Sequence, residues 1–148
     1  NAIVPPLLEG VAPHLLAPPA NVLRLSLHPE GLGPRLANAA QWRAHLLHRL
    51  QQQIAATADH QLQALHDEIA TYPCQGDEDA SHGTAPGSHI AVPFELHTSL
   101  GKLSFISTIT IFGTPVDVTL QELAVESFFP ADTATKTALA NMRAVGSH

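Results

Sequence analysis

Ten histidines are the side chains of this 148-residue chain best suited to chemistry, because an imidazole can bind a metal ion or carry a proton near neutral pH. His45 and His48 lie three residues apart, so one helix could present both to a single ion. No Asp or Glu in the same stretch adds a third ligand. His66 beside Asp67 is typical of a solvated helix face. We therefore expect no metal site and no cofactor.

Residues typical of covalent or acid–base catalysis are present, but not in catalytic spacing. No serine occupies a G-x-S-x-G turn, and the single cysteine, Cys74, follows the end of an expected helix beside a polar loop. The carboxylates of Asp77, Glu78 and Asp79 lie in that loop, where nothing would hold two of them in register for proton transfer. We expect no catalytic residues and no enzyme activity.

Composition limits the remaining classes of function. A 45% apolar content over 148 residues fits one domain, residues 1–148, with a hydrophobic core. The 7 Lys and Arg against 13 Asp and Glu give a net charge of -6, which repels a phosphate backbone. Charged residues make up 14%, below the roughly 25% of ordinary soluble domains, and this favours self-association. We expect a homodimer that does not itself bind DNA.

Features of membrane and secreted proteins are missing from the sequence. No apolar run approaches the roughly 20 residues that span a bilayer, and the first residues lack the basic start of a signal peptide. A lone cysteine cannot form an intramolecular disulfide, which fits a reducing compartment. The lack of an apolar span and of a signal peptide, together with the lone cysteine, favours a cytoplasmic protein without membrane contact. Because Asn1 is not an initiator methionine, we also expect the chain to be part of a longer protein.

The first half of the chain predicts one strand and two helices. Leucines alternate with other residues over 21–28, which is the period of a strand with one buried face. Asn38, three residues before Gln41, predicts a capping box at the start of a helix, and Asp59 predicts the cap of a second helix. The two helices should form a hairpin over one face of a sheet. The apolar stripe of the first helix comprises Trp42, Leu46, Leu50 and Ile54.

The second half predicts the sheet itself. Residues 75–88 are almost free of apolar side chains, so we expect a flexible loop. Three strands are predicted after it, and a short turn between the first two indicates an antiparallel hairpin. Asp132 predicts the cap of a final helix over residues 133–143. The predicted strands cover residues 90–98, 102–112 and 120–129.

A binding site is the remaining kind of function that the sequence favours. The predicted central strand is more apolar than a surface strand requires, and its surplus could either fill a core or wall a mostly apolar cavity with a few polar groups. Arg24 is the candidate partner for an acidic head group. The candidate ligand-binding residues are Arg24, Trp42, Leu46, Phe105, Ser107, Ile109, Phe112 and Phe128.

Two long segments carry a family resemblance. The segments NVLRLSLHPEGLGPRLANAAQWRAHLL and LSFISTITIFGTPVDVTLQELAVESFFPADTAT resemble the ligand-binding domain of MmyB-like transcription regulators, which belong to the Xre-type helix-turn-helix class. The resemblance implies an α+β fold, a PAS-like antiparallel sheet with flanking helices. It also implies a bacterial regulator that senses a small apolar or fatty-acid-like ligand. DNA would be bound through a helix-turn-helix domain that lies outside this chain.

Two hypotheses remain open after the resemblance. In the first, ligand binding shifts the population of helix–sheet arrangements and thereby changes the geometry of a dimer. In the second, the domain is a structural dimerisation module without a small-molecule ligand. The first predicts an internal cavity for a chain-like ligand, and the second predicts a dry, tightly packed centre.

Overall fold

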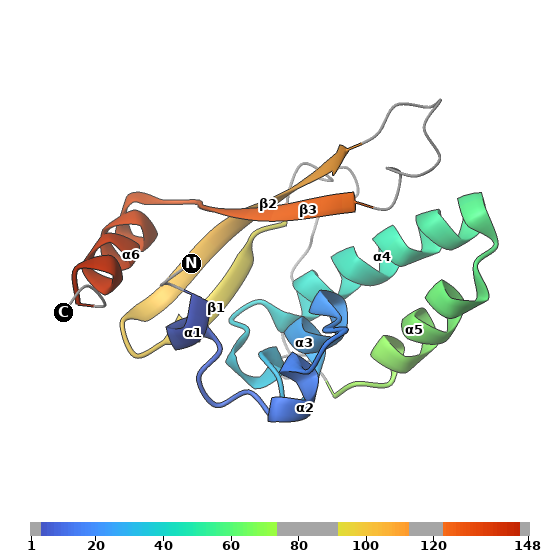
Figure 1. Cartoon of the computed structure of the whole chain (residues 1–148), viewed down its shortest axis with the longest axis horizontal. Helices are drawn as coiled ribbons and strands as arrows, with labels where there is room; N and C mark the ends of the chain where they lie inside the picture. Colours follow the sequence, from blue (N-terminus) through green and yellow to red (C-terminus); the bar gives the residue numbers. More distant parts are fainter. Residues whose placement is uncertain (1–3, 74–91, 113–122, 146–148) are drawn as a thin grey trace.

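Helices and an antiparallel sheet form the α+β fold that the sequence predicts. The structure, a computed structural model, describes residues 4–73, 92–112 and 123–145, and it describes no side chains for residues 109–112, 123–125 and 143–145. The loop predicted at residues 75–88 lies outside these ranges. Figure 1 shows helices α4 (Ala39–Thr57) and α5 (His60–Ala70) on one side of the sheet.

Short helices fill the N-terminal part, in which the prolines limit helix length. They are α1 (Val4–Leu7), α2 (Pro13–Leu16), α3 (Val22–Leu27) and the 3-10 turn η1 (Gly33–Arg35). Gly10 links α1 to α2 with a φ of 81°, a conformation that other residues rarely adopt. The described chain before α4 therefore contains short helices of at most six residues and no strand.

The strand predicted at residues 21–28 is wrong, because these residues form α3. The Asn21 side chain caps the helix by accepting a hydrogen bond from the Arg24 backbone N–H at 3.0 Å. The helix lies among α2, α4, α5 and η1, so it is contacted on several sides. Leu27 is buried and the Leu23 and Leu25 side chains are partly buried. A short helix with this much cover can bury leucines at every second position.

The helix hairpin is confirmed, and both helices begin after the predicted cap residues, although Asn38 lacks the predicted side-chain hydrogen bond to the helix backbone. The Asp59 side chain accepts from the Gln61 backbone N–H at 2.7 Å, as predicted. Asn38 caps nothing with its side chain, which instead donates to the Pro93 carbonyl at 2.8 Å and accepts from the Glu95 N–H at 3.3 Å. Backbone groups of the sheet edge thus compete successfully for the Asn38 amide. The buried residues of the predicted stripe are Trp42, Leu46 and Leu50, and Ile54 packs beside them.

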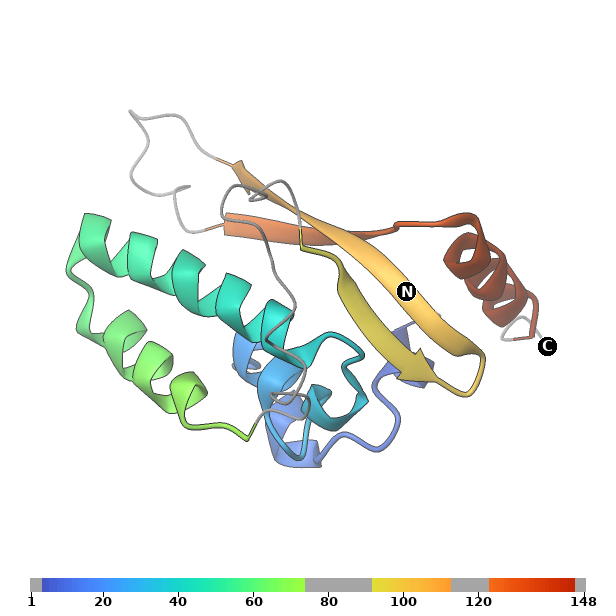
Figure 2. The ribbon, with the colours of Figure 1, turned by 180° about the vertical axis from the view of Figure 1, so that it is seen from behind.

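The three predicted strands occur in the predicted order. They are β1 (Phe94–Thr98), β2 (Gly101–Phe112) and β3 (Leu123–Pro130), paired antiparallel in the order β1-β2-β3. Val92 and Pro93 precede β1 although they were predicted to belong to it, and residues 90–91 and 120–122 lie outside the described part of the chain. Because β1 pairs only with residues 101–105, β2 and β3 continue past it as a two-stranded ribbon (Figure 2).

The final helix is confirmed, and it packs against β2 and β3. α6 (Thr133–Val145) begins where Asp132 accepts a hydrogen bond from the Thr135 backbone N–H at 2.7 Å. Thr135 is fully buried, and its Oγ1 accepts the Ser104 backbone N–H at 2.9 Å. β3 ends at Pro130, so no β3 carbonyl accepts the Ser104 N–H, and the Thr135 hydroxyl accepts it instead. Figure 1 shows α6 at the opposite end of the molecule from the α4–α5 loop.

We expect Thr135→Val to lower the free energy of unfolding by about 1–3 kcal/mol, because it leaves a buried backbone N–H without an acceptor at nearly constant side-chain volume. Urea denaturation measures the change. Thr137→Val is the matched control, since Thr137 is exposed on the same helix and its hydroxyl bonds only the Thr133 carbonyl. An equal loss in both variants would show that helix propensity, not the Ser104 contact, is responsible.

Candidate functional site

Four aromatic side chains form a continuous cluster between α4 and the sheet. The ring of Phe94 is central, with its centroid 5.2 Å from Trp42, 6.4 Å from Phe105 and 5.8 Å from Phe128. Sequence reasoning selected three of these residues but missed Phe94. Its position at the start of β1, opposite Phe105 in the register, was the signal that could have identified it.

This aromatic cluster extends from the core to the surface. Trp42, Phe94 and Phe105 are buried, whereas Phe128 is 40% exposed. Ser107 pairs with Phe128 across the ribbon and is half-buried, so its hydroxyl lies on the same face as the Phe128 ring. The exposed end of the cluster therefore combines an aromatic surface with one hydroxyl.

The inner end of the aromatic cluster is fixed by hydrogen bonding and packing. The Trp42 indole N–H donates to Ser26 Oγ at 3.4 Å, and the Ser26 hydroxyl donates to the Leu23 carbonyl at 2.9 Å. Leu46, one helical turn beyond Trp42, is 1% exposed and belongs to the core.

The His45 ring lies 5.6 Å from the Trp42 ring. Burial, followed by the charge of Arg49, lowers the pKa of His45. A neutral imidazole therefore lies beside the indole at neutral pH.

Two further candidates are placed by backbone register alone. Ile109 pairs with Glu126 and falls in the same alternating set of β2 positions as Phe105 and Ser107. Phe112 pairs with Leu123 and falls in the opposite set. The side chains of Ile109 and Phe112 are outside the described part of the structure, so their roles stay predictions.

Arg24 binds Glu68 at the contact between α3 and α5. Its Nε and Nη2 donate to the two carboxylate oxygens at 2.6 Å each, and the Tyr72 hydroxyl donates to the same carboxylate. The hydrogen bond from Arg24 lowers the pKa of Glu68 to about 2 despite partial desolvation. Burial first, and then the hydrogen bond to Glu68, raise the pKa of Tyr72 to about 12. The side chain proposed for an acidic ligand thus has an internal carboxylate partner.

This ion pair predicts an acid-sensitive contribution to stability. The pKa of Glu68 is lowered from 4.5 to about 2 on folding, so its contribution is complete above the unfolded pKa and is lost as pH falls toward 2. Chemical denaturation of the native chain and of Glu68→Gln should show a stability difference that shrinks between these two values. Arg24→Met should remove the same pH dependence, and the double variant should add little. A pH-independent difference would contradict the prediction.

The structure also brings together three side chains that the sequence did not connect. One ligand atom from each of His14, His28 and Glu30 lies within 4.8 Å of the others. However, His28 Nδ1 accepts the Glu30 backbone N–H at 3.0 Å, so the neutral ring carries its proton on Nε2. Metal binding would have to break this hydrogen bond, and the group does not form a prepared metal site.

Comparison with known proteins assigns the chain to a family. Residues 1–142 match the family described as the MmyB-like transcription regulator ligand binding domain. The chain therefore belongs to this family, as the resemblance predicted. No curated protein and no solved structure matches the chain. Across the described residues, no helix combines the length and apolar character needed to cross a bilayer.

Proposed function

We propose that this domain senses a small apolar or fatty-acid-like ligand for a bacterial helix-turn-helix regulator, and that it signals to a DNA-binding domain outside this chain. The family description supports ligand binding by a transcription regulator. The observation that carries the apolar chemistry is the aromatic cluster, which rises from the buried Trp42 to the 40% exposed Phe128. Such a surface can bury the alkyl chain of an amphiphile.

The proposed site has a hydroxyl near its exposed end, and Glu126 lies two residues before Phe128 on the same face of β3. Ser107 lies across the ribbon from Phe128 and could donate its hydroxyl to a ligand head group. Arg24 is engaged by Glu68, so it would reach an acidic ligand only by exchanging carboxylates. The site therefore favours an alkyl chain held by aromatic contact over a ligand held by a strong ion pair.

Signal transmission would follow from the position of Trp42. Its ring contacts Phe94 in the sheet, and its N–H contacts Ser26 in α3. A ligand that packs against Phe128 would contact the same aromatic cluster and could favour one position of α4 over another. The proposed PAS-like character of the domain rests on this arrangement of helices over an antiparallel sheet.

We expect palmitate to change the fluorescence of Trp42, the single tryptophan, and to raise the melting temperature of the chain. Mass spectrometry of extracts from denatured protein would identify a co-purified ligand. Phe128→Ser should weaken palmitate binding about tenfold, because it removes aromatic contact area. Its matched control is Phe129→Ser, since Phe129 is exposed at the next position on the opposite face of β3.

The ligand hypothesis fails if the extract is empty and no amphiphile shifts the melting temperature. It also fails if Phe129→Ser weakens palmitate binding as much as Phe128→Ser does, because binding would then not distinguish the two faces of the ribbon.

A second candidate function is dimerisation, which a different surface supports. Ile106 and Phe129 pair across β2 and β3 on the face away from the aromatic cluster, and they are 40% and 54% exposed. Adjacent exposed apolar side chains on a chain with 14% charged residues favour contact with a second copy. Dimerisation through this face is compatible with ligand binding on the other.

Phe129→Ser should shift the chain toward monomer in sedimentation experiments, because it removes the more exposed residue of this pair. Phe128→Ser should leave the oligomeric state unchanged. If the native chain sediments as a monomer at every accessible concentration, dimerisation through this face is excluded.

A further inference from the structure

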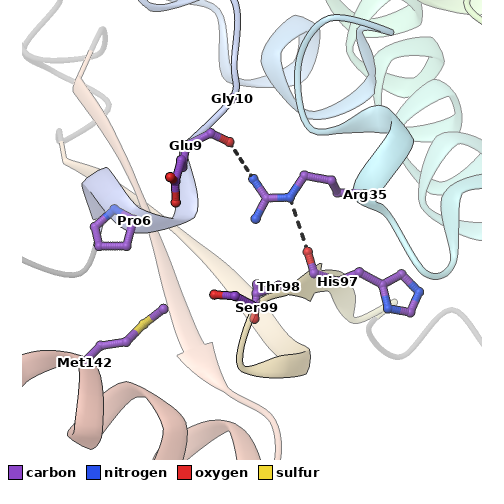
Figure 3. A pocket seen from close by; sticks show the side chains of 8 residues that line it. All are labelled: Pro6, Glu9, Gly10, Arg35, His97, Thr98, Ser99 and Met142. Atoms are coloured by element: carbon purple, nitrogen blue, oxygen red, sulfur yellow. Dashed lines mark hydrogen bonds between the residues drawn. The ribbon is translucent and has the colours of Figure 1, made fainter.

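A cavity separate from the aromatic cluster lies between the N-terminal turns, the β1–β2 turn and α6. Its volume is about 400 Å³, within the roughly 300–1,000 Å³ of small-molecule sites. Figure 3 shows Pro6 and Glu9 on one side, Arg35 across from Glu9, Ser99 below Arg35 and Met142 on α6. Three distant parts of the chain therefore form its walls.

The Arg35 guanidinium is rigidly held at this cavity. Nε donates to the His97 carbonyl at 3.2 Å, and Nη1 donates to the carbonyls of Leu7 and Glu9 at 3.0 Å each. Nη2 makes no hydrogen bond or ion pair with any residue that the structure describes, and in Figure 3 it faces the cavity. Its two N–H groups form a prepared donor for a carboxylate.

An unpaired negative charge lines the same cavity. The Glu9 carboxylate makes no ion pair with Arg35 or with another described residue, although Arg35 binds the Glu9 backbone carbonyl. The Ser99 hydroxyl also lacks a partner within the described ranges. The apolar part of the lining is formed by Pro6, on the same side as Glu9, and by Met142 on α6. A small cation would meet the positive charge of Arg35, and a small anion would meet the negative charge of Glu9. A ligand with a single charge is therefore repelled by one of these two side chains.

We propose that this cavity binds a small zwitterion with an apolar side chain, the chemistry of a free α-amino acid. The ligand carboxylate would accept from Arg35 Nη2 and from the Ser99 hydroxyl. The ligand ammonium would donate to Glu9, and the apolar side chain would lie against Met142 and Pro6. Binding would connect the N-terminal segment, the β1–β2 turn and α6 through one molecule.

This site is independent of the proposed apolar ligand, and the sequence provides a separate reporter for each. Met142 is the single methionine and lines the cavity, whereas Trp42 is the single tryptophan and belongs to the aromatic cluster. An unchanged Trp42 signal with palmitate tests the proposed function. An unchanged Met142 signal with an amino acid tests the present proposal, so the two failures are distinguishable.

The experiment titrates the full chain, labelled with ¹³C at the methionine methyl, with three probes that share one alkyl group. L-Leucine carries both charges, 4-methylpentanoate carries only the carboxylate, and 3-methylbutylamine carries only the ammonium. We expect L-leucine to shift the Met142 resonance and to bind at least about tenfold more tightly than either analogue, because each analogue loses one ion pair.

Glu9→Gln should reduce L-leucine binding to the level of 4-methylpentanoate without weakening 4-methylpentanoate itself. Glu9 is exposed and its backbone carbonyl remains available to Arg35, so the variant should fold normally. The matched control is Glu30→Gln, an exposed glutamate that does not line the cavity. A Met142 resonance that L-leucine leaves unmoved overturns the proposal. Equal binding of leucine and 4-methylpentanoate, or an unaffected Glu9→Gln variant, overturns it as well.

Discussion

The contact of the Trp42 ring with Phe94, at 5.2 Å between centroids, joins the helical part of the chain to its sheet. The same indole donates its N–H to Ser26, so one side chain of α4 contacts both α3 and β1. A buried indole requires a hydrogen-bond acceptor, and Ser26 provides it without opening the core to water. The position of α4 over the sheet, and with it the position of the aromatic cluster, depends on this arrangement.

Local sequence signals predicted most of the fold because they act over a few residues. The helix stripe from Trp42, the cap at Asp59 and the alternating strands need only periodicity and nearby hydrogen bonds. α3 was mistaken for a strand because its leucines are covered by helices that are distant in sequence, which periodicity does not detect. Asn38 was mistaken for a side-chain cap because its amide bonds β1, more than fifty residues away.

The residues of the candidate site also differ in whether their partners are near or distant in the sequence. The aromatic residues on β2, β3 and α4 were accessible to sequence reasoning because apolar surplus is visible locally. Arg24 pairs with Glu68 on another helix, and the local sequence around Arg24 does not show this partner. Arg35 gave no local signal, since its three acceptors belong to Leu7, Glu9 and His97. The sequence therefore does not show which polar side chains pair with groups far away in the chain. These pairings decide which charged side chains remain available to a ligand.

The bridge between Leu36 and Leu96 carries a consequence for the edges of the sheet. Ala37 donates its N–H to the Glu95 carbonyl at 2.9 Å, and the Asn38 side chain satisfies backbone groups of Pro93 and Glu95. The segment before α4 thus covers the outer edge of β1, where an open strand would template pairing with foreign chains. Within the described ranges, this part of the β1 edge is therefore unavailable for pairing with a strand of another chain.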